Sequence, residues 1–228
     1  MSKKHLIQEV QEYCEKNLTE KEFVPGTTYI PVSGPSLNPD DITSVVEATL
    51  DFWFTEWKRC AAFGRELSRV AGKKYTTLCN SGSSANLLAV SACTEKHPQK
   101  FIVTCAVGFA TTVAPIYQNG KVPIYVDIDP NTLSPRIDQV VDALNRYKKD
   151  IGGIILAHSL GFPYNEIVVG DQYRRVGKFT IADCCDALGA DFLGEPVGSY
   201  SDISFILSCS YHYRGGGWRS LHKLCGIA

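Results

Sequence analysis

Two acidic residues three positions apart, Asp183 and Asp186, mark the first place in this sequence where we expect chemistry. A strongly apolar run leads into Asp183, and a turn of small residues follows Asp186. The segment reads Ile181-Ala182-Asp183-Cys184-Cys185-Asp186-Ala187-Leu188-Gly189. Taken alone, an acid at the end of a predicted strand is explained equally well as a helix cap or a surface carboxylate.

A second candidate segment, Asn80-Ser81-Gly82-Ser83-Ser84-Ala85-Asn86, joins a predicted strand to a predicted helix. Small residues at such a turn let backbone N–H groups meet a phosphate, and the helix dipole favours an anion there. Small polar residues before a helix are also typical of an ordinary helix cap, and this alternative stays open.

Together, the two segments indicate a phosphorylated cofactor that contains a pyridine ring. Such a ring acts as an electron sink when a carboxylate keeps its nitrogen protonated, and its phosphate needs a neutral or positive cradle. Phe109 follows an apolar segment and could stack on the ring, although a core aromatic is the simpler interpretation. His158 ends a predicted buried strand, where it could belong to a site or be a core histidine.

Apolar and amphipathic segments alternate along the chain in the way that α/β folds require. Strands are predicted at 75–79, 101–105, 122–126, 153–158 and 179–182, and helices at 1–20, 42–54, 65–71, 85–93, 111–118, 134–148 and 166–176. The start signal Asn38-Pro39-Asp40-Asp41 precedes the second helix. This order predicts a mostly parallel sheet between helices, with sites at the carboxyl ends of its strands.

The composition is that of an ordinary globular protein. The chain has 228 residues, 44% of them apolar, with 23 basic and 24 acidic side chains. It holds no apolar run of about eighteen residues, no signal-like N-terminus and no basic cluster, so we expect a cytoplasmic protein that binds neither membrane nor nucleic acid. The nine cysteines include no CxxC pair, so neither a metal site nor a disulfide framework is expected.

These segments, in this order, resemble the pyridoxal-phosphate (PLP) sugar aminotransferase and dehydratase superfamily of DegT/StrS type. Within it they are most similar to the CDP-4-keto-6-deoxy-D-glucose 3-dehydratases of lipopolysaccharide O-antigen biosynthesis. The resemblance implies an aspartate-aminotransferase-like large domain, PLP fold type I. The segments that carry it, besides those around Gly82 and Asp183, are 23–26, 47–53, 108–113, 118–120 and 157–161.

The resemblance also implies roles for single residues. Gly82 and Ser83 would bind the cofactor phosphate, Phe109 would stack on the ring, Asp183 would pair with the pyridine nitrogen, and Asp186 would lie near the ring hydroxyl. The cofactor would work as pyridoxamine 5'-phosphate (PMP), with a histidine as the base. The implied partners are a nucleotide-linked 4-keto-6-deoxy sugar, an NADH-dependent iron–sulfur flavin reductase and a second copy of the chain.

The family pattern stops near residue 205. Codons allowed for residues 205–211, read one base later, can spell Ser-Phe-Tyr-Pro-Ala-His, which is part of the family's continuation. We therefore hypothesise a frameshift near residue 205. The expected parts of the chain are an N-terminal helix and arm (1–35), an incomplete PLP-binding large domain (36–205) and an aberrant, out-of-frame tail (206–228). On this hypothesis the small C-terminal domain and the family's 2Fe–2S cluster are missing, and His212 is only a weak candidate for the base.

Without that base and domain, we expect no catalysis by this chain itself, since a general base contributes roughly 10²- to 10⁴-fold. Two alternatives stay open. A sugar aminotransferase needs a lysine that binds the cofactor covalently, and only Lys223 follows the acidic segment. The chain could also be a non-catalytic fragment or a partner-binding remnant.

Overall fold

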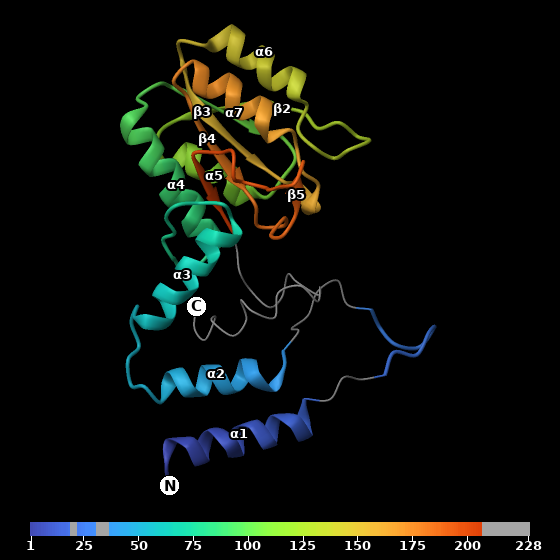
Figure 1. The fold of residues 1–228 in the computed structure, drawn as a ribbon. Helices are drawn as coiled ribbons and strands as arrows, with labels where there is room; N and C mark the ends of the chain where they lie inside the picture. The colour runs from blue at the N-terminus through green and yellow to red at the C-terminus, as the bar shows by residue number, and fades with distance from the viewer. Residues whose placement is uncertain (19–21, 31–36, 207–228) are drawn as a thin grey trace. The chain divides into compact units, whose positions relative to one another are not determined.

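The computed structural model describes residues 1–18, 22–30 and 37–206 (Figure 1). Within this part the chain forms two compact units, one made of residues 1–67 and 75–78 and the other of residues 68–74 and 79–206. The tail with His212 and Lys223 lies outside the described residues.

The second unit is built on one parallel sheet. Its strands are β1 (Phe101–Cys105), β2 (Val122–Val126), β3 (Ile151–Ala157), β4 (Phe179–Asp183) and β7 (Ile203–Phe205), in the order β2-β1-β3-β4-β7. All neighbouring strands run parallel. The register pairs Ala157 with Asp183 and Asp183 with Phe205, so the ends of β3, β4 and β7 meet at one edge. The predicted fold class is confirmed.

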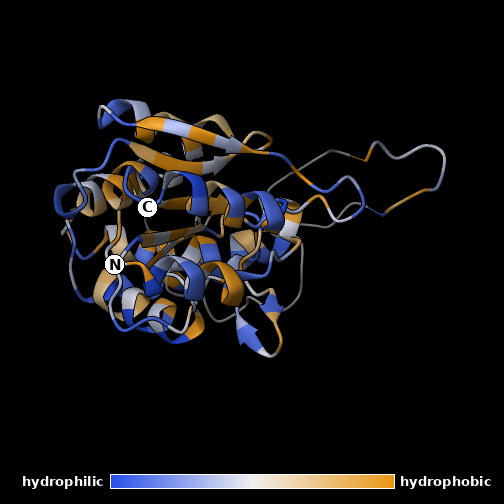
Figure 2. Cartoon of the chain, turned by 90° about the horizontal axis from the view of Figure 1, so that it is seen from above, coloured by the Kyte–Doolittle hydropathy of each residue, from blue (hydrophilic) through white to orange (hydrophobic). Residues whose placement is uncertain are grey.

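Helices cover both faces of this sheet, and strand periodicity decides which side chains each face buries. Val103, Ile154 and Leu156 point toward α6 (Ile137–Tyr147) and α7 (Glu166–Arg175), where they form one core cluster. Ile102, Ile155 and Ile181 point the other way, toward α4 (Gly82–Lys96) and α5 (Ala110–Gln118). The helices carry mixed hydrophilic and hydrophobic stretches, as expected for helices that bury one side (Figure 2).

Short elements complete the carboxyl side of the sheet. A 3-10 helix, η1 (Ser159–Gly161), follows β3. Along the chain, a small hairpin of β5 (Asp191–Phe192) and β6 (Glu195–Pro196) comes after β4 and before β7. The loop from Gly198 to Asp202 then leads into β7.

The first unit is helical. It contains α1 (Lys3–Asn17), α2 (Pro39–Thr49) and most of α3 (Lys58–Val70). The start signal of α2 is confirmed, because Asn38 and Asp41 form a reciprocal capping box. The predicted end at residue 54 was wrong: α2 stops at Thr49, and Phe52 adopts a left-handed backbone conformation with φ of 54°.

Most predicted elements are present within a few residues of their expected ends, but the strand predicted at 75–79 was wrong. That segment is not among the strands of the described sheet. Its aromatic and β-branched residues fit a pleated surface, but a strand exists only where a neighbour completes its hydrogen-bond ladder.

Across the described residues, no helix combines the length and hydropathy needed to cross a bilayer.

Candidate cofactor site

Asp183 is the last residue of β4, and its carboxylate is held from two directions. One oxygen, Oδ2, accepts a hydrogen bond from Thr112 Oγ1 at 2.7 Å, and Oδ1 accepts one from the backbone N–H of Cys185 at 3.1 Å. The residue is only 6% exposed. A buried carboxylate is costly unless donors satisfy it, so this is neither a helix cap nor a surface acid.

Sequence reasoning missed Thr112. It lies in the first turn of α5, which follows β1, and its bond to Asp183 fixes α5 against the carboxyl end of β4. The only sequence signal was its place three residues after Phe109, on a helix that starts at the same sheet edge.

Asp186 is exposed and ties two loops together. Its Oδ2 accepts a hydrogen bond from the backbone N–H of Leu160 in η1 at 3.3 Å. Leu160 and Gly161 both have positive φ values, 55° and 80°, and a Cβ on Gly161 would lie 3.2 Å from the Asp186 carbonyl oxygen. Asp186 therefore stabilises a tight turn, and its predicted place near a ring hydroxyl stays a prediction.

Gly82 and Ser83 open α4. The helix is capped by Ser81, whose side chain accepts a hydrogen bond from the Ser84 N–H at 3.1 Å. The cap alternative is thus confirmed for Ser81. Gly82 is buried and Ser83 is exposed. Their amides belong to the first turn, where helical N–H groups have no partner within the helix and can bind an anion.

Phe109 immediately precedes α5 and is 72% exposed, so the core-aromatic interpretation was wrong. The backbone beside it is open, since a Cβ added to Gly108 would meet nothing within 4 Å. An exposed aromatic ring on the loop between β1 and α5 is free to stack on a planar ligand at the carboxyl edge.

His158 is a core histidine. It is completely buried, and its ring stacks on Tyr164 with centroids 4.2 Å apart and an interplanar angle of 9°. Its Nδ1 accepts a hydrogen bond from the Tyr164 N–H at 3.4 Å. The His158 backbone N–H donates to the Asp183 carbonyl oxygen at 2.9 Å, so the residue supports the site without facing it.

Three of the residues predicted from sequence, Phe109, Asp183 and Asp186, lie at the carboxyl edge of the sheet. β1 and β4 are parallel strands of one sheet, so the loop with Phe109 and the carboxylate of Asp183 follow strand ends at the same edge. The start of α5 is joined to Asp183 through Thr112, and α4 packs against both α5 and β4. Among the described residues, Thr112 and Cys185 donate to the Asp183 side chain, and neither Gly82 nor Ser83 does.

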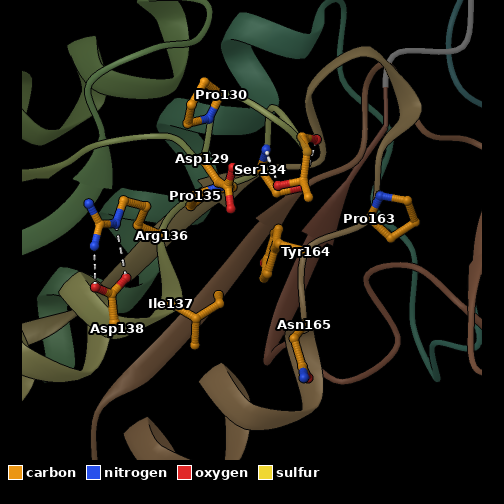
Figure 3. Close-up of a pocket in the computed structure, with 11 residues that line it drawn as sticks. Asp129, Pro130, Ser134, Pro135, Arg136, Ile137, Asp138, Pro163, Tyr164 and Asn165 are labelled. Carbon is orange, nitrogen blue, oxygen red and sulfur yellow. Dashed lines mark hydrogen bonds and ion pairs between the residues drawn. The ribbon is translucent and has the colours of Figure 1, made fainter.

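A cavity of about 580 Å³ lies elsewhere on this unit (Figure 3). It opens between the loop after β2 and the segment before α7, and an ion pair of Arg136 and Asp138 at 2.6 Å lies on its wall. None of the predicted site residues lines it. We therefore place the site by its polar groups, at the edge that carries Asp183.

Fold and site together define an α/β protein that can hold a phosphate at a helix start and a ring at a buried carboxylate. The chain belongs to the DegT/DnrJ/EryC1/StrS aminotransferase family, whose family model matches residues 35–212. The predicted superfamily is confirmed.

Curated relatives cover most of the chain. It is 34% identical to the lipopolysaccharide biosynthesis protein RfbH of Salmonella typhimurium over 92% of its length and 49% of that protein. It is 32% identical to dTDP-4-dehydro-2,6-dideoxy-D-glucose 3-dehydratase of Saccharopolyspora spinosa, over 95% of this chain and 47% of the relative. The chain therefore spans about half the length of these relatives.

Solved structures agree on the fold. The PLP form of the putative sugar aminotransferase Spr1654 of Streptococcus pneumoniae superposes with a TM-score of 0.71 at 22% identity, over 78% of this chain and 48% of that one. GDP-4-keto-6-deoxy-D-mannose-3-dehydratase of E. coli, with bound hydrated PLP, superposes with a TM-score of 0.69 at 25% identity, over 75% of this chain and 44% of that one. The first likeness concerns the fold alone.

Proposed function

We propose that this chain carries the cofactor-binding large domain of a PLP- or PMP-dependent nucleotide-sugar enzyme, and that the enzyme is a 3-dehydratase of deoxysugar biosynthesis. The observation that carries the proposal is Asp183, a buried carboxylate at a parallel strand end with both oxygens held by donors. A rigid acceptor at this place suits a protonated pyridine nitrogen.

The residues present fit the cofactor. Asp183 retains lone pairs for a third donor, because each of its oxygens accepts one hydrogen bond from the described residues. The first-turn amides of Gly82 and Ser83 would hold the phosphate, and Phe109 would cover one face of the ring. When bound, the cofactor supplies an electron sink next to the substrate carbon. Asp183 would keep the ring nitrogen protonated, which makes that sink effective.

Proton transfer at the substrate needs another residue. The two described histidines of the sheet unit are engaged in packing, His158 on Tyr164 and His97 edge-on against Phe179 at 5.3 Å. We therefore expect the base to lie outside the described residues. Turnover by the full chain that survives replacement of His212, His222 and Lys223 would contradict this.

Two comparisons support the dehydratase branch. Among relatives from Saccharopolyspora spinosa, the 3-dehydratase is 32% identical and dTDP-4-dehydro-2,3,6-trideoxy-D-glucose 4-aminotransferase is 25% identical. Both names specify dTDP-linked deoxysugars, and the E. coli dehydratase name specifies a GDP-linked one. We propose a nucleotide-linked 4-keto-6-deoxy sugar as substrate, a homodimer in the cytoplasm, and a reductase partner for the complete enzyme.

A sugar aminotransferase is the second candidate, because several relatives carry that name and Spr1654 was solved in both PLP and PMP forms. Absorbance separates the two. After incubation with PLP or PMP and exhaustive dialysis, a dehydratase-type chain should retain a near-ultraviolet band of PMP. A visible band that Lys223→Ala removes would favour the aminotransferase. Loss of both cofactors would contradict the proposal and favour a non-catalytic remnant.

A further inference from the structure

One buried acid has no part in the proposed chemistry but lies beside His158, which supports Asp183. Glu166, the first residue of α7, is 1% exposed. Its Oε2 accepts a hydrogen bond from the Gly198 N–H at 2.7 Å, and its Oε1 accepts one from Ser201 Oγ at 2.5 Å. His158 Nε2 lies 3.7 Å from Oε2. A buried charge of this kind is rarely retained without partners, and here they come from two segments, the end of β3 and the loop 198–201.

These partners also show that Glu166 is held as a carboxylate. Burial acts to raise the pKa of Glu166, but the His158 ring 3.7 Å away and the hydrogen bonds from Ser201 and Gly198 together lower that pKa below its ordinary value. Since His158 Nδ1 accepts from the Tyr164 N–H, the proton of a neutral ring sits on Nε2, which faces Glu166. The Tyr164 N–H therefore fixes the tautomer of a neutral His158, and Nε2 faces Glu166 without a hydrogen bond among the described residues.

The segments that Glu166 joins lie on either side of the strand that carries Asp183. His158 follows β3, and the loop with Gly198 and Ser201 leads into β7, while β4 runs between these two strands. The His158 N–H donates to the Asp183 carbonyl oxygen at 2.9 Å, and the Cys184 N–H donates to the Phe205 carbonyl oxygen at 2.9 Å. The backbone around Asp183 is thus held from both sides.

Lys73 and Cys184 hold the loop 198–201 in place. Lys73 donates from Nζ to the carbonyl oxygens of Ser199, at 3.2 Å, and Ser201. Gly198 has a φ of 86°, and a Cβ there would lie 2.8 Å from Cys184 Sγ. The loop therefore packs directly on the residue after Asp183, and a shift of the loop would be transmitted to it.

We propose that Glu166 is a positioning residue: acting through His158 and the loop 198–201, it fixes the direction of the Asp183 carboxylate toward a bound pyridine ring. The cofactor part of this inference rests on the proposed function. The positioning part concerns only the protein, and its natural reporter is the Cys185 amide, which donates to Asp183 Oδ1.

Hydrogen exchange of the full chain without cofactor tests the positioning. Glu166→Ala should speed exchange of the Cys185 and His158 amides about 10-fold, since it removes the acceptor of two donors. Glu166→Gln still accepts from Gly198 and should restore most of the protection that Glu166→Ala loses. If the alanine variant does not fold, the His158→Phe variant carries the test. His158→Phe, which keeps a flat ring against Tyr164, should reproduce part of the effect.

The control is a substitution of equal cost at the other end of the same sheet. Ile151 is completely buried at the start of β3, far along the strand from the Asp183 edge. Ile151→Val or Ile151→Ala, whichever matches the lost stability, should leave the Cys185 amide at its wild-type rate relative to global opening. If Cys185 exchange responds equally to the Ile151 and Glu166 variants, Glu166 is only structural and the inference is wrong.

Cofactor binding separates this inference from the proposed function. We expect Glu166→Ala to raise the dissociation constant of PMP about 10-fold, Glu166→Gln to recover most of it, and the Ile151 control to leave it unchanged. If the wild-type chain binds no PMP while Cys185 exchange still responds to Glu166→Ala, the proposed function fails and the positioning stands. If PMP binds and neither readout responds to Glu166, the positioning fails and the proposed function stands.

Discussion

At the scale of single residues, the candidate site depends on Asp183, a buried carboxylate that accepts hydrogen bonds from Thr112 and from the Cys185 N–H. The place of Asp183 after an apolar run indicated a strand end, and the structure confirms a buried carboxylate there. Its partner Thr112, 71 residues away, and the buried Glu166 were not predicted. Glu166 reads as an ordinary acid in the first turn of a helix, and only loop residues 32 and 35 positions later make it part of the interior.

Replacing Thr112 by Val removes the hydroxyl that donates to Asp183 while keeping the shape of the side chain. Because a hydrogen bond to a buried charge contributes about 1.5–3 kcal/mol, we expect unfolding free energy to fall by about that amount. Urea denaturation measures it. Thr94→Val is the control, since Thr94 donates only to the Ser91 carbonyl oxygen and, at 3.3 Å, to Asn119. Equal losses in both variants would contradict a special role for Thr112.

The lowered pKa of Glu166 predicts acid sensitivity. Unfolded Glu takes up a proton near its ordinary pKa of 4.5, whereas folded Glu166 stays ionised to lower pH. Its contribution to stability is therefore complete above pH 4.5 and is lost as pH falls toward the folded pKa. Urea denaturation between about pH 5.5 and pH 3 should show a shallower loss of stability in Glu166→Gln than in wild type. Parallel curves for the two proteins would contradict this.

At the scale of elements, periodicity predicted most of the fold, because a strand sealed between two helix layers is apolar on both sides. The fully buried β3 is the clearest case. The predicted strand at 75–79 failed for the complementary reason: composition cannot say whether a neighbouring strand is present to pair with it. The start of α4 was predicted three residues late, since Gly82 and Ser83 are weak helix formers and their place depends on the Ser81 cap.

The two adjacent glycines of β3 provide a matched test of sheet packing. A Cβ on Gly153 would lie 2.4 Å from the Phe179 ring and 2.5 Å from its carbonyl oxygen, whereas one on Gly152 would meet nothing closer than 3.5 Å. We expect Gly153→Ala to cost about 1–3 kcal/mol or more, because β3 and β4 must separate. Gly152→Ala should cost much less. Denaturation midpoints that rank the two variants the other way would contradict the described pairing.

At the scale of the whole molecule, the chain spans about half the length of its curated relatives. The described sheet, the Asp183 edge and the family membership agree with each other, while the residues after 206 lie outside the described structure. The frameshift stays a prediction from the genetic code. Sequencing the coding DNA from before the Phe205 codon to well past residue 228 should reveal the family's His-containing stretch one base out of register. If no reading frame of that DNA continues the family sequence, the frameshift hypothesis is wrong.

In the proposed function, Asp183 holds the protonated nitrogen of a pyridine cofactor. The most direct measurement is the ¹⁵N chemical shift of ring-labelled PMP bound to the full chain, in wild type and in Asp183→Asn. We expect the wild-type ring nitrogen to stay protonated at pH values where free PMP has lost that proton, and the Asn variant to lose either the protonation or the binding. A bound ring with an unprotonated nitrogen in wild type, or identical shifts in both proteins, would contradict the account.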